Sequence, residues 1–173
     1  MNKRWVKSII SVVFALFCVS AVSAKSLSIQ IIQNNPGQDK IWAASYLFEQ
    51  DITDYFFDSG DIVSSSPIWI SDTEDKNRSA LRASLQENRE GGMEVLVRVE
   101  VFYDVKNSSN PDGLLLDNIK NVEWKAYSVA SGVEIFNGRA EPERVDGKNN
   151  NESGLSQFAG FVAYKINTQM KYR

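Results

Sequence analysis

Apolar residues alternate with polar ones in several short segments of the chain, which is the period of a β-strand. Ser26 to Gln33 (SLSIQIIQ) and Glu94 to Asp104 (EVLVRVEVFYD) show the alternation most clearly. In the second segment four valines and Tyr103 share one face, while charged residues occupy the other. One apolar face and one wet face are typical of strands in an antiparallel sheet.

Elsewhere apolar residues recur at three- and four-residue spacing, which predicts amphipathic helices. A first helix is expected over residues 40–57, with Asp39 as its N-cap and Gly60 as its stop. A second helix, with a thin apolar face, is expected to end at Gly91-Gly92. A third carries the apolar residues Leu155, Phe158, Ala159, Val162, Ile166 and Met170.

Turn residues divide the rest of the chain into short strands. Asp61 to Ser66 is predicted to be a strand closed by Pro67. Asn121 to Val129 and Val133 to Ala140 are predicted to form a hairpin with Ser131-Gly132 as its turn. The predicted order is β-α-β-α-β-β-β-α. This order indicates an α+β fold, a single layered domain in which helices cover one face of a mostly antiparallel sheet.

The first 24 residues have the three-part pattern of a secretory signal peptide. Basic residues at positions 3, 4 and 7 precede an apolar run from Ile9 to Val19, and Val22-Ser23-Ala24 provides the cleavage motif. The run is shorter than the roughly 20 apolar residues that a membrane-spanning helix requires. We therefore expect cleavage after Ala24, export to the periplasm or the medium, and one mature domain over residues 25–173.

Cys18 is the only cysteine, and it lies inside the expected signal peptide. Phe17 precedes it, whereas a lipoprotein signal has a small residue before the acylated cysteine, so the sequence favours cleavage over a lipid anchor. The mature chain then has no thiol for disulfides or metal binding. Cleavage also removes three of 19 basic residues, leaving 16 against 22 acidic ones, a net charge of −6. An acidic domain without a basic run is a poor match to nucleic acid or anionic lipid.

The chain has no histidine, which removes Ser-His-Asp and Cys-His catalysis and histidine metal sites. An acidic loop, Ser71 to Asn77, lacks the ligand spacing of a calcium loop. Strand glutamates such as Glu100 and Glu123 could form a glycosidase-like pair, but alternation places them on polar faces. Ser64-Ser65-Ser66 has no elbow motif and no basic partner. We therefore predict that the protein is not an enzyme and has no catalytic, cofactor-binding or metal-binding residues, with a carboxylate hydrolase as the least favoured alternative.

Aromatic and aliphatic side chains give a more specific signal. Trp42 and Tyr46 lie four residues apart on the first predicted helix, beside its apolar stripe. Ile68-Trp69-Ile70 is an apolar trio in a predicted loop next to Pro67. Tryptophan and tyrosine are enriched at interface hot spots, so these five residues are the candidate partner contact. The alternative is that they pack under loops or widen the core.

The arrangement resembles the LpoB, TolB N-terminal and CsgG-like group of periplasmic α/β domains. Three segments carry the resemblance. In Phe56 to Val63 (FFDSGDIV) a helix ends at a small residue before a strand, Met93 to Val101 matches the central strand, and Val129 to Val133 matches a hairpin with a glycine turn. The resemblance covers nearly all of the mature chain.

The resemblance implies a non-enzymatic envelope protein that acts by protein contact, as an adaptor or assembly factor, with no cofactor and no stable membrane insertion. The segment from Val105 to Ile119 is too short for the hairpin of a CsgG-type pore, whose strands need roughly 9 to 11 residues each. The expected partner is another envelope protein. The alternative function is a small-ligand or glycan-binding module that uses Trp42, Trp69 or Trp124.

Overall fold

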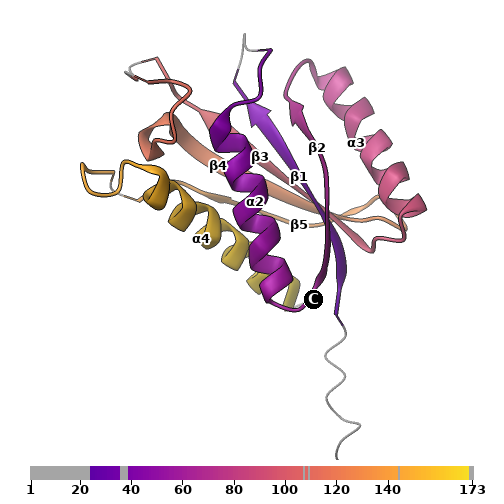
Figure 1. Cartoon of the computed structure of the whole chain (residues 1–173). Helices are drawn as coiled ribbons and strands as arrows, with labels where there is room; N and C mark the ends of the chain where they lie inside the picture. Colours follow the sequence, from indigo (N-terminus) through magenta and orange to yellow (C-terminus); the bar gives the residue numbers. More distant parts are fainter. Residues whose placement is uncertain (1–23, 36–38, 107, 109, 144, 172–173) are drawn as a thin grey trace, which may run out of the picture.

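The computed structural model describes residues 24–35, 39–106, 108, 110–143 and 145–171. Residues 1–23 of the expected signal peptide, including Cys18, lie outside this part. In chain order the elements are β1 (Ser26–Asn34), α2 (Ala43–Asp58), β2 (Ile62–Ile70), α3 (Glu74–Glu90), β3 (Val95–Tyr103), the 3-10 turn η1 (Leu116–Asn118), β4 (Ile119–Ser128), β5 (Glu134–Ala140) and α4 (Glu152–Lys171) (Figure 1). This confirms the predicted order and the α+β class. None of the described helices is both long and apolar enough to cross a membrane.

The described strands form one mixed sheet in the order β2-β1-β3-β4-β5. β1 pairs in parallel with both β2 and β3, whereas the pairs β3–β4 and β4–β5 are antiparallel. The first half of the sheet therefore differs from the mostly antiparallel arrangement that the sequence predicted. Alternation along a strand reports which of its faces is buried, and it contains no information on the direction of the neighbouring strands.

Helices cover both faces of this sheet, although the sequence predicted helices on one face. α2 and α4 pack side by side on the face that carries Leu27 and Ile29 (Figure 1). α3 lies on the opposite face, where Asn88 Nδ2 donates a hydrogen bond to Ser66 Oγ (3.2 Å), which in turn pairs with Ser28 Oγ (3.1 Å). Parallel crossovers are almost always right-handed, so two that run in opposite directions along a sheet place their helices on opposite faces.

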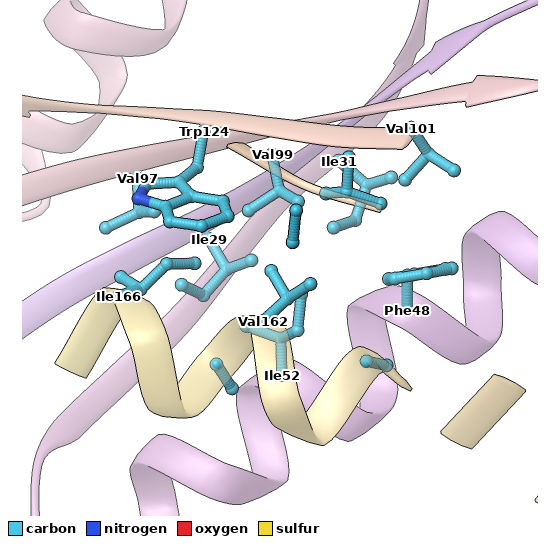
Figure 2. Close-up of a cluster of buried hydrophobic side chains, with 14 of the residues drawn as sticks. Ile29, Ile31, Phe48, Ile52, Val97, Val99, Val101, Trp124, Val162 and Ile166 are labelled. Atoms are coloured by element: carbon cyan, nitrogen blue, oxygen red, sulfur yellow. The ribbon is translucent and has the colours of Figure 1, made fainter. Parts of the chain in front are cut away.

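The main core fills the space between the sheet and the helix pair α2–α4. Figure 2 shows side chains of the sheet, including Ile29 and Val97, facing Val162 of α4 and residues of α2. These side chains are fully buried. Phe48 of α2 meets Phe158 of α4 edge to face, with ring centroids 6.1 Å apart. The core faces of β1 and β3 and the apolar stripes of α2 and α4 are those that the periodicity predicted.

β2 is longer than predicted, because it continues through Pro67. Ile68-Trp69-Ile70 therefore belongs to a strand and not to a loop. Proline lacks the amide that a central strand needs, but β2 pairs only with β1 and is an edge strand. A register shift between Gln30 and Ile32 of β1 also places an extra residue on β2 at this point.

Two helices begin at other residues than predicted. α2 begins at Ala43, and Asp39 is not its N-cap; the cap position is Trp42, which makes no side-chain capping bond. α3 begins at Glu74, inside the predicted acidic loop, with Thr73 at the cap position. The acidic residues of that segment lie in the first turn of the helix, where negative charge is favourable.

The predicted hairpin of β4 and β5 is confirmed, and its Gly132 has a φ of +69°, a conformation that favours glycine. Gly138 lies opposite Trp124 in the register, and a Cβ at Gly138 would overlap the indole ring. The indole is fixed by a hydrogen bond from its Nε1 to Gln169 Oε1 of α4 (2.7 Å). The small residue on β5 therefore makes room for a buried tryptophan that connects the hairpin to α4.

Replacing Gly138 with alanine is expected to destabilise the protein by about 1–3 kcal/mol, because the added methyl group forces the indole out of place. Gly160→Ala is the matched control in α4, where no atom lies within 4 Å of the added Cβ. That substitution is expected to stabilise the helix by roughly 0.5–1 kcal/mol. Urea-induced unfolding of both variants measures the difference. Equal stabilities would show that the close approach of Trp124 to Gly138 carries no energetic weight.

Candidate functional site

A groove lies beside the start of α2 and the free edge of β2. Its volume is about 850 Å³. Tyr46 contributes a side chain that is 53 % exposed, and Ile68, Trp69 and Ile70 contribute half-buried ones. Residues that line it besides these four are Asp39, Lys40, Ile41, Asp72 and Lys76. The structure thus brings together four of the five residues of the predicted partner contact; we call this surface the edge groove.

The fifth predicted residue, Trp42, lies in the core and not in the edge groove. Its side chain is only 5 % exposed, and its ring meets Tyr103 edge to face with centroids 4.8 Å apart. Trp124, which the sequence offered for ligand binding, is also buried in the core. Trp69 is therefore the only one of these three tryptophans that reaches the groove.

The register of β2 decides which side of the sheet each groove residue occupies. Ile70 lies opposite Gln33, on the face covered by α2, and Ile68 packs against the main core on that face. Trp69 lies opposite Ile32 and points to the α3 face. The edge groove therefore wraps around the edge of the sheet and has a wall on each side.

Gln33, at the end of β1, holds the start of α2 in place. Its Oε1 accepts hydrogen bonds from the backbone N–H of Trp42 (2.8 Å) and from Ser45 Oγ (2.9 Å), and its Nε2 donates to the carbonyl of Lys40 (2.9 Å). The side chain is completely buried. A glutamine from the sheet thus replaces the missing side-chain cap of α2, and it fixes the turn of helix that carries Tyr46.

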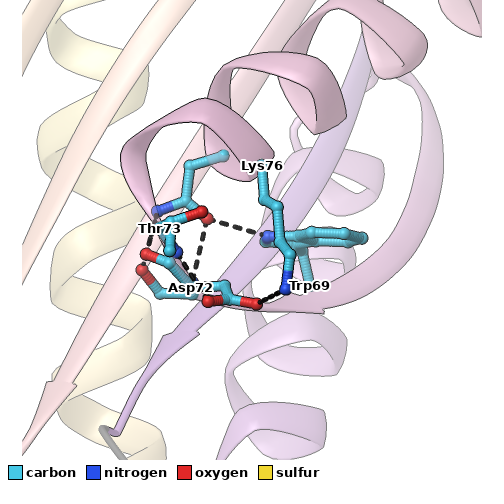
Figure 3. A network of polar contacts seen from close by, with 6 residues as sticks. Trp69, Asp72, Thr73 and Lys76 are labelled. Atoms are coloured by element: carbon cyan, nitrogen blue, oxygen red, sulfur yellow. Dashed lines mark hydrogen bonds and ion pairs between the residues drawn. The ribbon is translucent and has the colours of Figure 1, made fainter.

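A polar network fixes the other wall of the edge groove (Figure 3). Asn77 Oδ1 accepts hydrogen bonds from Trp69 Nε1 and from the backbone N–H of Asp72, both at 3.0 Å. Asn77 Nδ2 donates to Ser71 Oγ (3.0 Å). One asparagine therefore ties the indole to the loop that precedes α3. A side chain held in this way has little conformational freedom left to lose in any further contact.

Asp72 closes this network through Lys76, whose Nζ forms an ion pair with Asp72 Oδ2. The hydrogen bond from Lys76 Nζ within this ion pair lowers the pKa of the Asp72 carboxyl below its ordinary value, and a second hydrogen bond from the backbone N–H of Thr73 lowers it further. A carboxyl with a lowered pKa in the folded state stabilises the fold above its unfolded-state pKa of about 3.9, and the contribution is lost as the pH falls through the lower folded-state value.

Replacing Lys76 with methionine is expected to raise the pKa of Asp72 towards the ordinary value of an exposed aspartate, because the largest cause of the lowering is removed. A carboxyl-carbon NMR titration of both proteins measures the change. Arg82→Met, on the same helix and outside this network, is the control and should leave the titration unchanged. An Asp72 titration identical in wild type and Lys76→Met would contradict the ion pair.

Several other residues that the sequence offered for chemistry make structural contacts instead. Ser66 is buried and bonded to Ser28 and Asn88. Glu74 and Asp75 form ion pairs with Arg78 on the exposed surface of α3. In the part of the chain that the structure describes, no group of three or more acidic or cysteine side chains has the arrangement of a metal site.

Glu100 and Glu123, the two strand glutamates that could form a glycosidase-like pair, are directly opposite each other on β3 and β4. They line a small hollow of about 130 Å³ on the α3 face of the sheet, next to Arg98. Glu100 accepts a hydrogen bond from Asn34 Nδ2 (2.7 Å), and Glu123 lies 3.5 Å from Arg139 in an ion pair. Burial lowers the pKa of the Arg98 guanidinium. Each carboxylate thus has its own partner on a polar strand face.

Two residues that the sequence patterns did not single out, Gln33 and Asn77, shape the groove without lining it. Gln33 continues the apolar stripe of β1 after Ile31, and a polar residue at a core position was a signal for a buried hydrogen-bonding role. Asn77 had no such signal, because its partners Trp69 and Ser71 are placed by the turn into α3.

Solved structures of several bacterial proteins are similar to this chain. The PelC dodecamer from Paraburkholderia phytofirmans is 15 % identical, with a TM-score of 0.48, and the match covers 84 % of this chain and 86 % of that one. The LpoB C-terminal domain from Salmonella enterica is 10 % identical, with a TM-score of 0.40 and coverages of 74 % and 90 %. TolB from Acinetobacter baumannii is 13 % identical, with a TM-score of 0.41 and coverages of 84 % and 28 %. The likeness to LpoB and TolB agrees with the resemblance seen in the sequence.

No curated protein matches the sequence. A family model matches residues 26–171, which is nearly all of the part that the structure describes. The chain therefore belongs to the family whose description is "Uncharacterised protein".

Proposed function

We propose that this chain is an exported, non-enzymatic protein of the bacterial envelope that acts by binding another protein through the edge groove. The observation that carries the proposal is the groove itself, where an exposed tyrosine and three half-buried apolar side chains lie together on fixed elements. Tyrosine and tryptophan in such positions are typical anchors of protein interfaces. Export rests on the N-terminal sequence pattern.

The chemistry of the site also favours contact over catalysis. Structural partners bind the side chains of Ser66, Glu74, Asp75 and Glu100, and the chain has no histidine for proton transfer near neutral pH. The groove is wide and open, whereas small-molecule sites bury most of the ligand surface. With Trp42 and Trp124 in the core, the alternative of a glycan-binding module has a single tryptophan left.

Lysine-directed crosslinking in cells, followed by mass spectrometry, tests this proposal. Lys40 and Lys76 line the groove and have side chains that are 68 % and 64 % exposed. Lys125 on β4 and Lys165 on α4 are exposed and lie outside the groove, and they serve as internal controls. We expect crosslinks to one envelope protein from Lys40 and Lys76 and not from the controls. Crosslinks spread evenly over all four lysines, or none to another protein, would contradict the proposal.

A further inference from the structure

On its outer side β2 has no neighbour among the described strands, so its backbone groups on that side are free of ladder hydrogen bonds. The N–H of Ile62 bonds to the carbonyl of Lys25 (2.9 Å), and the N–H of Ser71 bonds to the carbonyl of Gln33 (2.8 Å), so both amides point towards β1. Successive amides of a strand point in opposite directions. The N–H groups of Val63 and Ile70 therefore point away from β1, towards the side where the described strands provide no neighbour.

The two edge strands of the sheet differ in how they are protected. β5 carries charged residues, Glu134 and Arg139, which discourage pairing with another strand. β2 has no charged residue, and the features that oppose pairing along it are Pro67 and the bulge beside it. Beyond Pro67, the segment Ile68-Trp69-Ile70 is apolar and lines the edge groove. The less protected edge is thus the one that the groove surrounds.

The shape of the groove matches an added strand better than a helix or a flat surface. One wall, with Tyr46 and Ile70, lies on the α2 face, and the other, with Trp69 and Lys76, lies on the α3 face. A segment that touches both walls has to lie along the edge between them. An extended chain sends alternate side chains to opposite faces, so it places apolar groups against both walls at once.

We propose that the partner binds by adding an extended strand of its own to the free edge of β2 beside Ile68-Trp69-Ile70. The partner segment alternates apolar side chains, and its backbone bonds to the outward N–H and carbonyl of Ile70. It is uncharged, because the charged residues that line the groove are two aspartates, Asp39 and Asp72, and two lysines, Lys40 and Lys76, whose formal charges cancel. Each lysine is also held in an ion pair, Lys76 with Asp72 and Lys40 with Asp112. It belongs to a different protein, because two copies of a chain with the same net negative charge repel each other and the β5 edge of a second copy is charged. Pairing of two β2 edges, which carry no charge, is the competing outcome of the test. This inference rests on the proposed function and names its mode of binding.

A substitution that removes one outward amide tests the inference. Ile70→Pro deletes the outward N–H and leaves the bonds of Ile62 and Ser71 to β1 intact, while Ile70→Val keeps both the amide and an apolar side chain. We expect crosslinking at Lys40 and Lys76 to fall about 3- to 10-fold in Ile70→Pro, because one hydrogen bond to the partner is lost. Ile70→Val loses only one methylene of the apolar contact, and we expect a clearly smaller fall in that variant. Circular dichroism shows whether each variant is folded.

Amide hydrogen exchange of the wild-type chain in the crosslinked complex provides a second readout that needs no variant. We expect the exchange of the Ile70 amide to slow at least about tenfold relative to the free chain. Slower exchange of the Val63 amide as well would show that the added strand continues past Pro67. The amide of Ser71, already bonded to β1, should change much less.

These outcomes separate the two proposals. If the partner is captured but Ile70→Pro and the exchange of Ile70 show no change, strand addition is wrong and groove binding stands. If the wild-type chain captures no specific protein at Lys40 and Lys76, the proposed function itself fails. A crosslinked species made only of two copies of this chain would overturn the assignment of the occupant.

Discussion

Replacing Phe48 with alanine is expected to lower the free energy of unfolding by about 3–5 kcal/mol, because a large buried side chain is lost from the main core. Phe48 is fully buried, and its ring meets Phe158 edge to face between α2 and α4. Truncation removes this contact and leaves a cavity at the interface of the two helices that cover the main core. Urea-induced unfolding, followed by the helical circular dichroism signal, measures the loss.

Phe57→Ala is the matched control for this prediction. Phe57 lies on the same helix, has the same side chain, and is 71 % exposed. Its truncation is expected to change stability by no more than about 0.5 kcal/mol, as for most surface substitutions. Similar losses in Phe48→Ala and Phe57→Ala would mean that α2 is not held to the sheet by the buried face assigned to it.

Gln33→Leu is expected to cost about 2–3 kcal/mol, because it leaves the buried N–H of Trp42 and the part-buried carbonyl of Lys40 without their hydrogen-bond partners. Leucine has a similar volume, so the loss reports hydrogen bonding and not a cavity. The same urea experiment measures it. Gln50→Leu, on the exposed surface of α2, is the control and should be close to neutral.

Gln33 also links stability to the edge groove. Loss of its bonds releases the first turn of α2, and Tyr46 lies only one residue after Ser45, which Gln33 also contacts. We therefore expect Gln33→Leu to weaken crosslinking at Lys40 as well as stability. A variant that lost stability and kept full crosslinking would show that the groove does not depend on this anchor.

Much of the fold follows from local patterns in the sequence. The alternation in β1 and β3, the helical spacing in α4, and the Ser131-Gly132 turn each predict the observed element, because burial of one face imposes the period and a tight turn favours glycine. Strand direction and the placement of α3 did not follow. They depend on which strands become neighbours, and this is decided by crossovers between residues far apart in the chain.

The candidate site was predicted in part. Tyr46 and Ile68-Trp69-Ile70 line one groove. The trio was predicted to lie in a loop because proline usually ends a strand, whereas in the structure it belongs to β2. The rule fails at an edge strand, where one side needs no backbone partner. The prediction that Trp42 lies on the surface of the helix was wrong, because α2 begins only at Ala43. Trp42 precedes the helix, and its ring packs in the core against Tyr103.

Site-specific photo-crosslinking at Tyr46, compared with Tyr164, tests the central claim most directly. Both are tyrosines on the surface of a helix, and they are 53 % and 54 % exposed, but only Tyr46 lines the edge groove. With a photo-reactive phenylalanine at each position in turn, we predict that position 46 captures one defined envelope protein in living cells and that position 164 captures none. Equal capture at both positions, or no capture at position 46, would contradict the claim that this groove is the binding surface.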